Sequence, residues 1–295
     1  MNVRNIFKAV VLVIMIAGCR NRPSPSGQIG DDFSASGDMD EVKEIYYRFP
    51  SPDEMLNFID KEELNFTDDF LLPVENSTDF LDSRSQALNL GVYTADMAYI
   101  TLFQRQKEAL TYFRVIYGLS EQLRIAAAFD HNLLKRFEDN LKIPDSLKFI
   151  ADEAMTDIVD YLVKNDKEKV FAIISIGGFI EGLYIAFNIA GEYSAENPIV
   201  QRISDQKLVL DNLLGYCQDY KSDQNVKESI QLLEPIRGIY SQMIVTSEET
   251  SVTKTEDGSL IIDGGDKITI SENQFVHLRE TLFTARRSIT ENSEN

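Results

Sequence analysis

The apolar segment of residues 170–190 places the strongest constraint on how this chain can fold. The segment is long enough to cross a bilayer as a helix, and it carries one charged residue, Glu181, near its centre. A carboxylate at that place would cost several kcal/mol in lipid, whereas a helix that is apolar on all sides is typical of the centre of a soluble bundle. We therefore expect a buried central helix. A membrane-spanning helix that packs through Gly178 and Gly182 is the alternative.

Apolar residues recur with helical spacing over nearly all of residues 41–245. Ser51-Pro52 and Asn197-Pro198 each combine an N-cap residue with a proline that suits the first turn of a helix. Seven or eight helices joined by short turns predict an all-α helical bundle. The pattern places two helices within 77–129, broken near Gln104, and further helices at about 130–141, 145–164, 167–190, 198–220, 224–245 and 272–290.

A change of composition at about residues 250–271 interrupts the helical pattern. β-branched residues there alternate with the turn-forming segments Asp257-Gly258 and Asp263–Asp266, which is typical of tight hairpin turns. We expect a small β-hairpin of two or three strands. The second segment lacks the ligand spacing of an EF-hand calcium loop, so no metal site is expected. The helix that follows ends in Arg286-Arg287, which we expect to complement the helix dipole.

The first residues of the chain have the pattern of a secretory signal. Arg4 and Lys8 precede a short apolar run that ends at Gly18-Cys19. This pattern resembles the signal of bacterial lipoproteins, which implies that residues 1–18 are removed and that Cys19 carries the lipid. Residues 19–41 are rich in Pro, Gly and Ser, and we expect them to form a disordered tether. Residues 42–291 are then the helical domain, which includes the hairpin.

The residue after the lipidated cysteine indicates where the protein is sorted. By the enteric sorting rule an aspartate at this position favours retention in the inner membrane, and this chain has Arg20. We therefore expect lipid anchoring at the periplasmic face of the outer membrane. The tether has no acidic run directly after Cys19, which argues against export to the cell surface.

The charge and the missing motifs narrow the classes of function. The chain has 29 basic and 48 acidic residues, a formal net charge of −19, so binding to nucleic acid through a basic face is not expected. Glycine-rich phosphate loops, paired metal-binding histidines, nucleophile elbows and Cys-x-x-Cys pairs are absent from the sequence. We therefore assign no catalytic residue, no metal and no cofactor. Cys217 lies in an apolar helical pattern, and we expect a buried thiol.

Two apolar segments resemble each other at an offset of 85 residues. In residues 88–100 Asp96 precedes Tyr99 by three positions, and in the central segment Glu181 precedes Tyr184 in the same way. A spacing of three places each carboxylate and phenol on one face of a helix. The match suggests an internal duplication. If the two helices pack together, two acids and two phenols converge near the core.

Three interpretations of these four residues remain open. In the first, Asp96 and Glu181 are bonded to tyrosines or helix caps and fix the register of the helices, because a buried carboxylate requires a partner. In the second, Asp96, Tyr99, Glu181 and Tyr184 line an acidic pocket for a small cation or amine. In the third, the two carboxylates act as a catalytic acid and base.

Residues 90–99 and 177–186 resemble segments of a family of uncharacterised, mostly helical bacterial lipoproteins. The resemblance covers most of residues 45–245 and implies no activity. With the signal pattern, it predicts a lipid-anchored cell-envelope protein of binding or scaffolding type. Its expected partners are the membrane, through the lipid anchor, and an unidentified envelope protein. The alternatives are a cation- or amine-binding protein and an enzyme with paired carboxylates.

Overall fold

The computed structural model describes residues 65–130, 132–140, 143–254 and 260–291. The predicted signal peptide, Cys19, the tether and the helix after Ser51 lie outside these ranges. The elements within them are η1 (Val74–Thr78), α4 (Ser83–Leu102), α5 (Gln106–Gln122), η2 (Ala126–Ala128), α6 (Leu133–Asn140), α7 (Pro144–Lys164), α8 (Glu168–Ala190), α9 (Pro198–Asp219), α10 (Gln224–Tyr240), β1 (Ile244–Lys254), β2 (Leu260–Thr269) and α11 (Glu272–Thr290).

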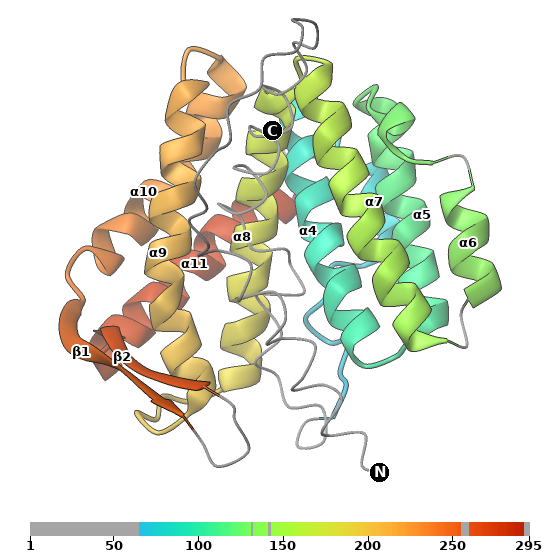
Figure 1. Ribbon diagram of the computed structural model, residues 1–295. Helices are drawn as coiled ribbons and strands as arrows, with labels where there is room; N and C mark the ends of the chain where they lie inside the picture. The colour runs from blue at the N-terminus through green and yellow to red at the C-terminus, as the bar shows by residue number, and fades with distance from the viewer. Residues whose placement is uncertain (1–64, 131, 141–142, 255–259, 292–295) are drawn as a thin grey trace, which may run out of the picture. The chain divides into compact units, whose positions relative to one another are not determined.

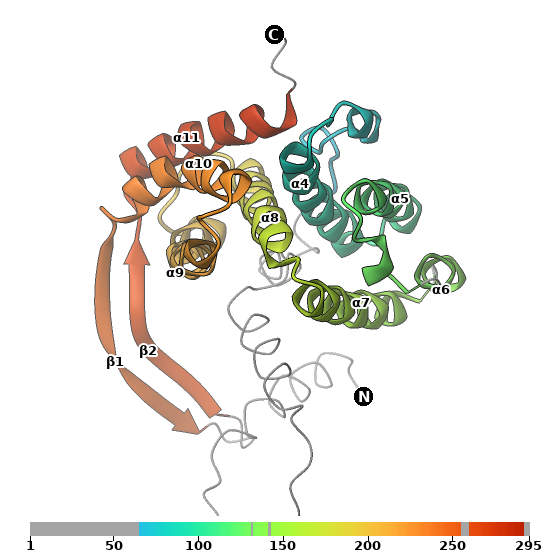
Figure 2. The ribbon, with the colours of Figure 1, turned by 90° about the horizontal axis from the view of Figure 1, so that it is seen from above.

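The described part of the chain is an all-α bundle with a two-stranded hairpin near the C-terminus (Figure 1), as the sequence predicted. Eight α-helices lie in these ranges, and α8 packs against α4, α7, α9, α10 and α11. Seen from above, α8 lies between α4 and the group formed by α9, α10 and α11 (Figure 2). Glu181, near the middle of α8, has no exposed surface.

Within the described ranges, α8 is the one helix that is long and apolar enough to cross a membrane. Its most apolar stretch is 72% buried inside the domain. The other helices of the bundle therefore cover the surface that lipid would otherwise contact.

Local sequence signals set the ends of the helices. The side chains of Asp82 and Asp223 accept hydrogen bonds from backbone N–H groups in the first turns of α4 and α10. Ser271 forms a capping box with Gln274 at the start of α11. The predicted break near Gln104 is present: α4 ends at Leu102, and Gln104 has a positive φ of 57°.

Helices α4 and α8 approach each other at glycines. A Cβ atom on Gly91 of α4 would lie 2.0 Å from the Ile174 carbonyl oxygen, and one on Gly177 of α8 would lie 1.9 Å from that of Leu88. A Cβ on Gly178 would meet the Gly91 carbonyl oxygen at an ordinary 3.5 Å. The two backbones can therefore touch only because residues 91 and 177 have no side chain.

The hairpin is longer than predicted, since it spans residues 244–269 instead of about 250–271. Ile244 pairs with Thr269 and Lys254 with Leu260 in an antiparallel ladder. The prediction of a turn at Asp263–Asp266 is wrong, because β2 continues through these residues. β1 has one extra residue between Glu248 and Ser251, a β-bulge opposite this glycine-containing stretch. The predicted turn at 257–258 lies outside the described residues.

Candidate functional site

Asp96 and Glu181 meet in the core between α4 and α8. Both side chains have 0% of their surface exposed. The two helices run in the same direction, since Gly91 lies beside Gly178 and Asp96 lies beside Glu181 about one turn later. The convergence of the two carboxylates, which the sequence suggested, is therefore present in the structure.

Arg286 of α11 provides the positive charge of the cluster. Its Nε donates to Glu181 Oε2 at 2.9 Å, and its Nη2 donates to Oε1 at 3.1 Å, a bidentate ion pair. The guanidinium carbon lies 4.3 Å from the centre of the Tyr184 ring, as in a cation–π contact. The arginine side chain is 14% exposed, so the pair is almost fully withdrawn from water.

The surroundings of the two carboxyl groups favour one proton on the pair. Burial raises the pKa of Asp96 well above its usual value, and the charge of Glu181 raises it further. Burial also raises the pKa of Glu181, while Arg286 opposes that shift. Asp96 Oδ1 has no conventional donor in reach, and a proton on it satisfies this oxygen by donating to Glu181. We therefore assign a neutral Asp96 and an ionised Glu181, so that the cluster carries no net charge.

An irregular segment, residues 65–73, covers the cluster, and we call it the strap. The Leu72 N–H donates to Asp96 Oδ2 at 3.1 Å, and Arg286 Nη2 donates to the Phe70 carbonyl oxygen at 3.4 Å. The Tyr112 hydroxyl donates to the Leu72 carbonyl oxygen at 3.0 Å, and that of Tyr93 to the Pro73 carbonyl oxygen at 2.9 Å. Tyrosines of α4 and α5 therefore bind the strap instead of the carboxylates.

The structure divides the four predicted residues into two groups. Asp96 and Glu181 form the centre of the cluster, while the phenols of Tyr99 and Tyr184 are not hydrogen bonded to it in the described structure. The Tyr99 hydroxyl accepts the Thr67 N–H at 3.5 Å, and its ring contacts aromatic side chains of the strap. Tyr184 contributes the face of its ring to Arg286.

Sequence reasoning missed Arg286 and the strap. We expected Arg286 to complement the dipole at the end of the helix, whereas the structure shows its guanidinium paired with Glu181. A signal was available: Arg286 continues the inward-facing spacing of Phe275, Leu278, Leu282 and Ile289, which are all buried. The strap has no periodic pattern, and its contacts link residues 20 to 216 positions apart.

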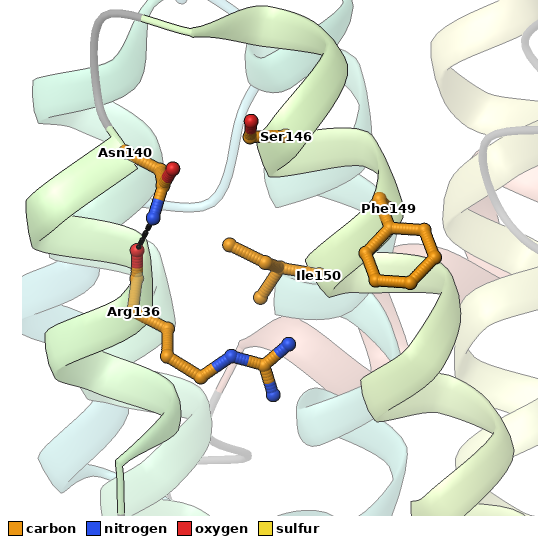
Figure 3. Close-up of a pocket in the computed structure, with 5 residues that line it drawn as sticks. All are labelled: Arg136, Asn140, Ser146, Phe149 and Ile150. Atoms are coloured by element: carbon orange, nitrogen blue, oxygen red, sulfur yellow. Dashed lines mark hydrogen bonds between the residues drawn. The ribbon is translucent and has the colours of Figure 1, made fainter.

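A second feature is an open groove of about 410 Å³ between α6 and α7 (Figure 3). Arg136 and Asn140 of α6 and Ser146, Phe149 and Ile150 of α7 line it. The guanidinium of Arg136 is already paired with Asp130 at 3.6 Å and with Glu153. The groove therefore offers no uncompensated charge to a ligand.

Cys217 of α9 is a buried free thiol, as expected. Burial raises its pKa to about 12, so the thiol is protonated near neutral pH. In the part of the chain that the structure describes, no three His, Cys, Asp or Glu side chains gather as a metal site would require.

Comparison with protein-family models, curated proteins and solved structures finds no match for this chain.

Proposed function

We propose that this protein is a lipid-anchored component of the cell envelope that acts by binding or scaffolding. The signal pattern that ends at Cys19 supports the anchor. The observation that favours scaffolding over ligand binding is the occupancy of the acidic cluster. Arg286 lies where an external cation would otherwise bind, with both guanidinium contacts on Glu181 and an aromatic face beside it.

The same cluster argues against the alternative functions. A cation or amine site needs an accessible carboxylate, and Asp96 and Glu181 have no exposed surface. A catalytic pair needs room for a substrate between its acid and base, whereas these carboxyl groups contact each other beneath the strap. We infer that the cluster holds α4, α8 and α11 in register, which is the first of the three interpretations.

The anchor is tested by the substitution Cys19→Ser in the full chain. The parent protein is expected in the membrane fraction, in the detergent phase after phase separation, and labelled by a radioactive fatty acid. Cys19→Ser is expected to lose the label and to move to the soluble fraction or remain uncleaved. Cys217→Ser is the matched control, because its thiol is buried, and it should keep the label. Equal partitioning of Cys19→Ser and the parent would end the lipoprotein proposal.

A further inference from the structure

The strap is attached to the bundle mainly through the buried cluster and a layer of aromatic rings. The rings of Phe66 and Phe70 lie 5.7 and 5.4 Å from that of Tyr99, and Phe70 also meets Tyr184 at 6.5 Å. Leu71 and Leu72 are buried. Over these residues the strap has no helix or strand, so its attachment depends on these side chains and on the hydrogen bonds to Asp96, Arg286, Tyr93 and Tyr112.

We propose that the strap is a proton-controlled latch, closed while Asp96 and Glu181 share one proton and open when that proton is lost to solvent. Opening would uncover the rings of Tyr99 and Tyr184. The latch does not depend on the lipid anchor, so the failure of either proposal leaves the other intact.

The charged and titratable groups around Asp96 determine how the strap responds to a change of pH. Glu181 approaches it from α8, Arg286 from α11, Tyr112 from α5 and Tyr93 from α4. Burial raises the pKa of both phenols above the usual range, so both stay neutral near physiological pH. With Asp96 neutral, the charges of Glu181 and Arg286 balance. Loss of the proton leaves two carboxylates and one guanidinium in a buried site, which is unfavourable.

Proton linkage determines whether the strap opens at high or at low pH. Closing the strap raises the pKa of Asp96 above its value in the open, hydrated state, because burial and Glu181 both disfavour the ionised form. The closed state therefore holds one more proton than the open state at pH values between the two pKa values. The latch is fully closed below the open-state pKa and weakens as the pH rises through this window.

A single tryptophan can report the position of the strap, since the chain contains none. Phe66→Trp places the reporter on the strap, in contact with Tyr99. In the full chain in detergent, raised from about pH 5 to about pH 9, above the usual Asp pKa of ~3.9, we expect its emission to shift to longer wavelengths and its quenching by acrylamide to rise several-fold. Circular dichroism should show unchanged helix content.

Asp96→Asn in the Phe66→Trp background isolates the proton. The amide oxygen accepts the Leu72 N–H and the amide nitrogen donates to Glu181, which reproduces the neutral acid without a titratable group. We expect a closed strap at every pH. Asp79→Asn, which removes an exposed carboxylate beyond the strap, should leave the pH response of the reporter unchanged.

Glu181→Gln gives a second reading if Asp96→Asn fails to fold. Removing the neighbouring charge lets Arg286 stabilise an ionised Asp96 within the closed strap, so the opening at high pH should be much weaker than in the parent or absent. Three results would overturn the latch: a reporter that does not respond to pH in the parent, an unchanged pH response in Asp96→Asn, or helix content that falls together with the reporter signal.

Discussion

At the scale of single residues, Arg286 supplies the positive charge of the acidic cluster. One interpretation of the sequence had assigned that charge to a bound cation or amine. It neutralises Glu181, lies against the Tyr184 ring and donates to the Phe70 carbonyl oxygen of the strap. The ion pair joins α8 to α11 through two residues that lie 105 positions apart in the sequence. Because the pair is buried, the loss of one partner should cost far more than the loss of a surface ion pair.

We expect Arg286→Met to lower the free energy of unfolding by about 3–5 kcal/mol, the usual cost of leaving a buried charge without its partner. The measurement is urea unfolding followed by circular dichroism. Glu181→Gln combined with Arg286→Met should recover part of the loss. The loss should also shrink as the pH falls, since a protonated Glu181 needs no counter-ion. Arg287→Met, at the exposed neighbouring position, should change stability by less than about 0.5 kcal/mol. Equal effects of the two arginine substitutions on the free energy of unfolding would show that the buried pair does not stabilise the fold.

The sequence allowed part of this site to be predicted. Asp96 and Glu181 stand in otherwise apolar helical stretches, where a charge is conspicuous, and their convergence followed from the repeated spacing. Arg286 was misassigned because it stands beside Arg287 near a helix end, where a basic pair has an ordinary explanation in the helix dipole. Tyr99 was misassigned because spacing on one helix shows which face a phenol shares but not which backbone group it reaches.

At the scale of secondary-structure elements, the contact between α4 and α8 depends on two glycines. The sequence singled out Gly178 and Gly182, whereas the closest backbone contacts are made by Gly91 and Gly177. The limits of α7, α8, α9 and α11 were predicted to within one residue. The helix predicted to reach residue 245 is wrong at its end, because α10 ends at Tyr240 and β1 begins at Ile244. The predicted position of the hairpin was displaced because Gly264-Gly265 has the composition of a turn. In the structure these two glycines stay extended, because β2 pairs with the bulged strand β1.

Gly91→Ala should therefore be strongly destabilising. Its Cβ would lie 2.0 Å from the Ile174 carbonyl oxygen, so one helix must shift, and we expect a loss of about 3 kcal/mol or more in chemical unfolding. Gly118→Ala on α5 is the matched control, because nothing lies within 4 Å of its Cβ. That substitution should raise stability by about 0.5–1 kcal/mol through helix propensity. If both variants unfold like the parent, the close contact between α4 and α8 does not exist in solution.

At the scale of the whole molecule, the apolar helix that first suggested a membrane span lies inside a bundle. Five helices pack against α8, and its one carboxylate is paired with a residue from the far end of the chain. A helix that spans a bilayer would face lipid over much of its surface, whereas most of the apolar surface of α8 is covered by protein. In the lipoprotein proposal, attachment to the membrane then depends on the lipid proposed at Cys19.

A fragment that starts at residue 42 should therefore be soluble and monodisperse without detergent. It lacks the predicted signal and tether but keeps the strap and all the helices that cover α8. We expect a single cooperative thermal transition, and a monomer or small oligomer by light scattering. In the same assay the full chain with Cys19→Ser should behave alike once its signal is removed, because neither protein carries the lipid.

A fragment that stays in solution only with detergent, or that inserts into vesicles through residues 170–190, would establish the membrane-spanning alternative. The buried ion pair provides an internal check, since Glu181 in a folded soluble fragment should resist modification by carbodiimide, whereas exposed carboxylates such as Asp79 should react.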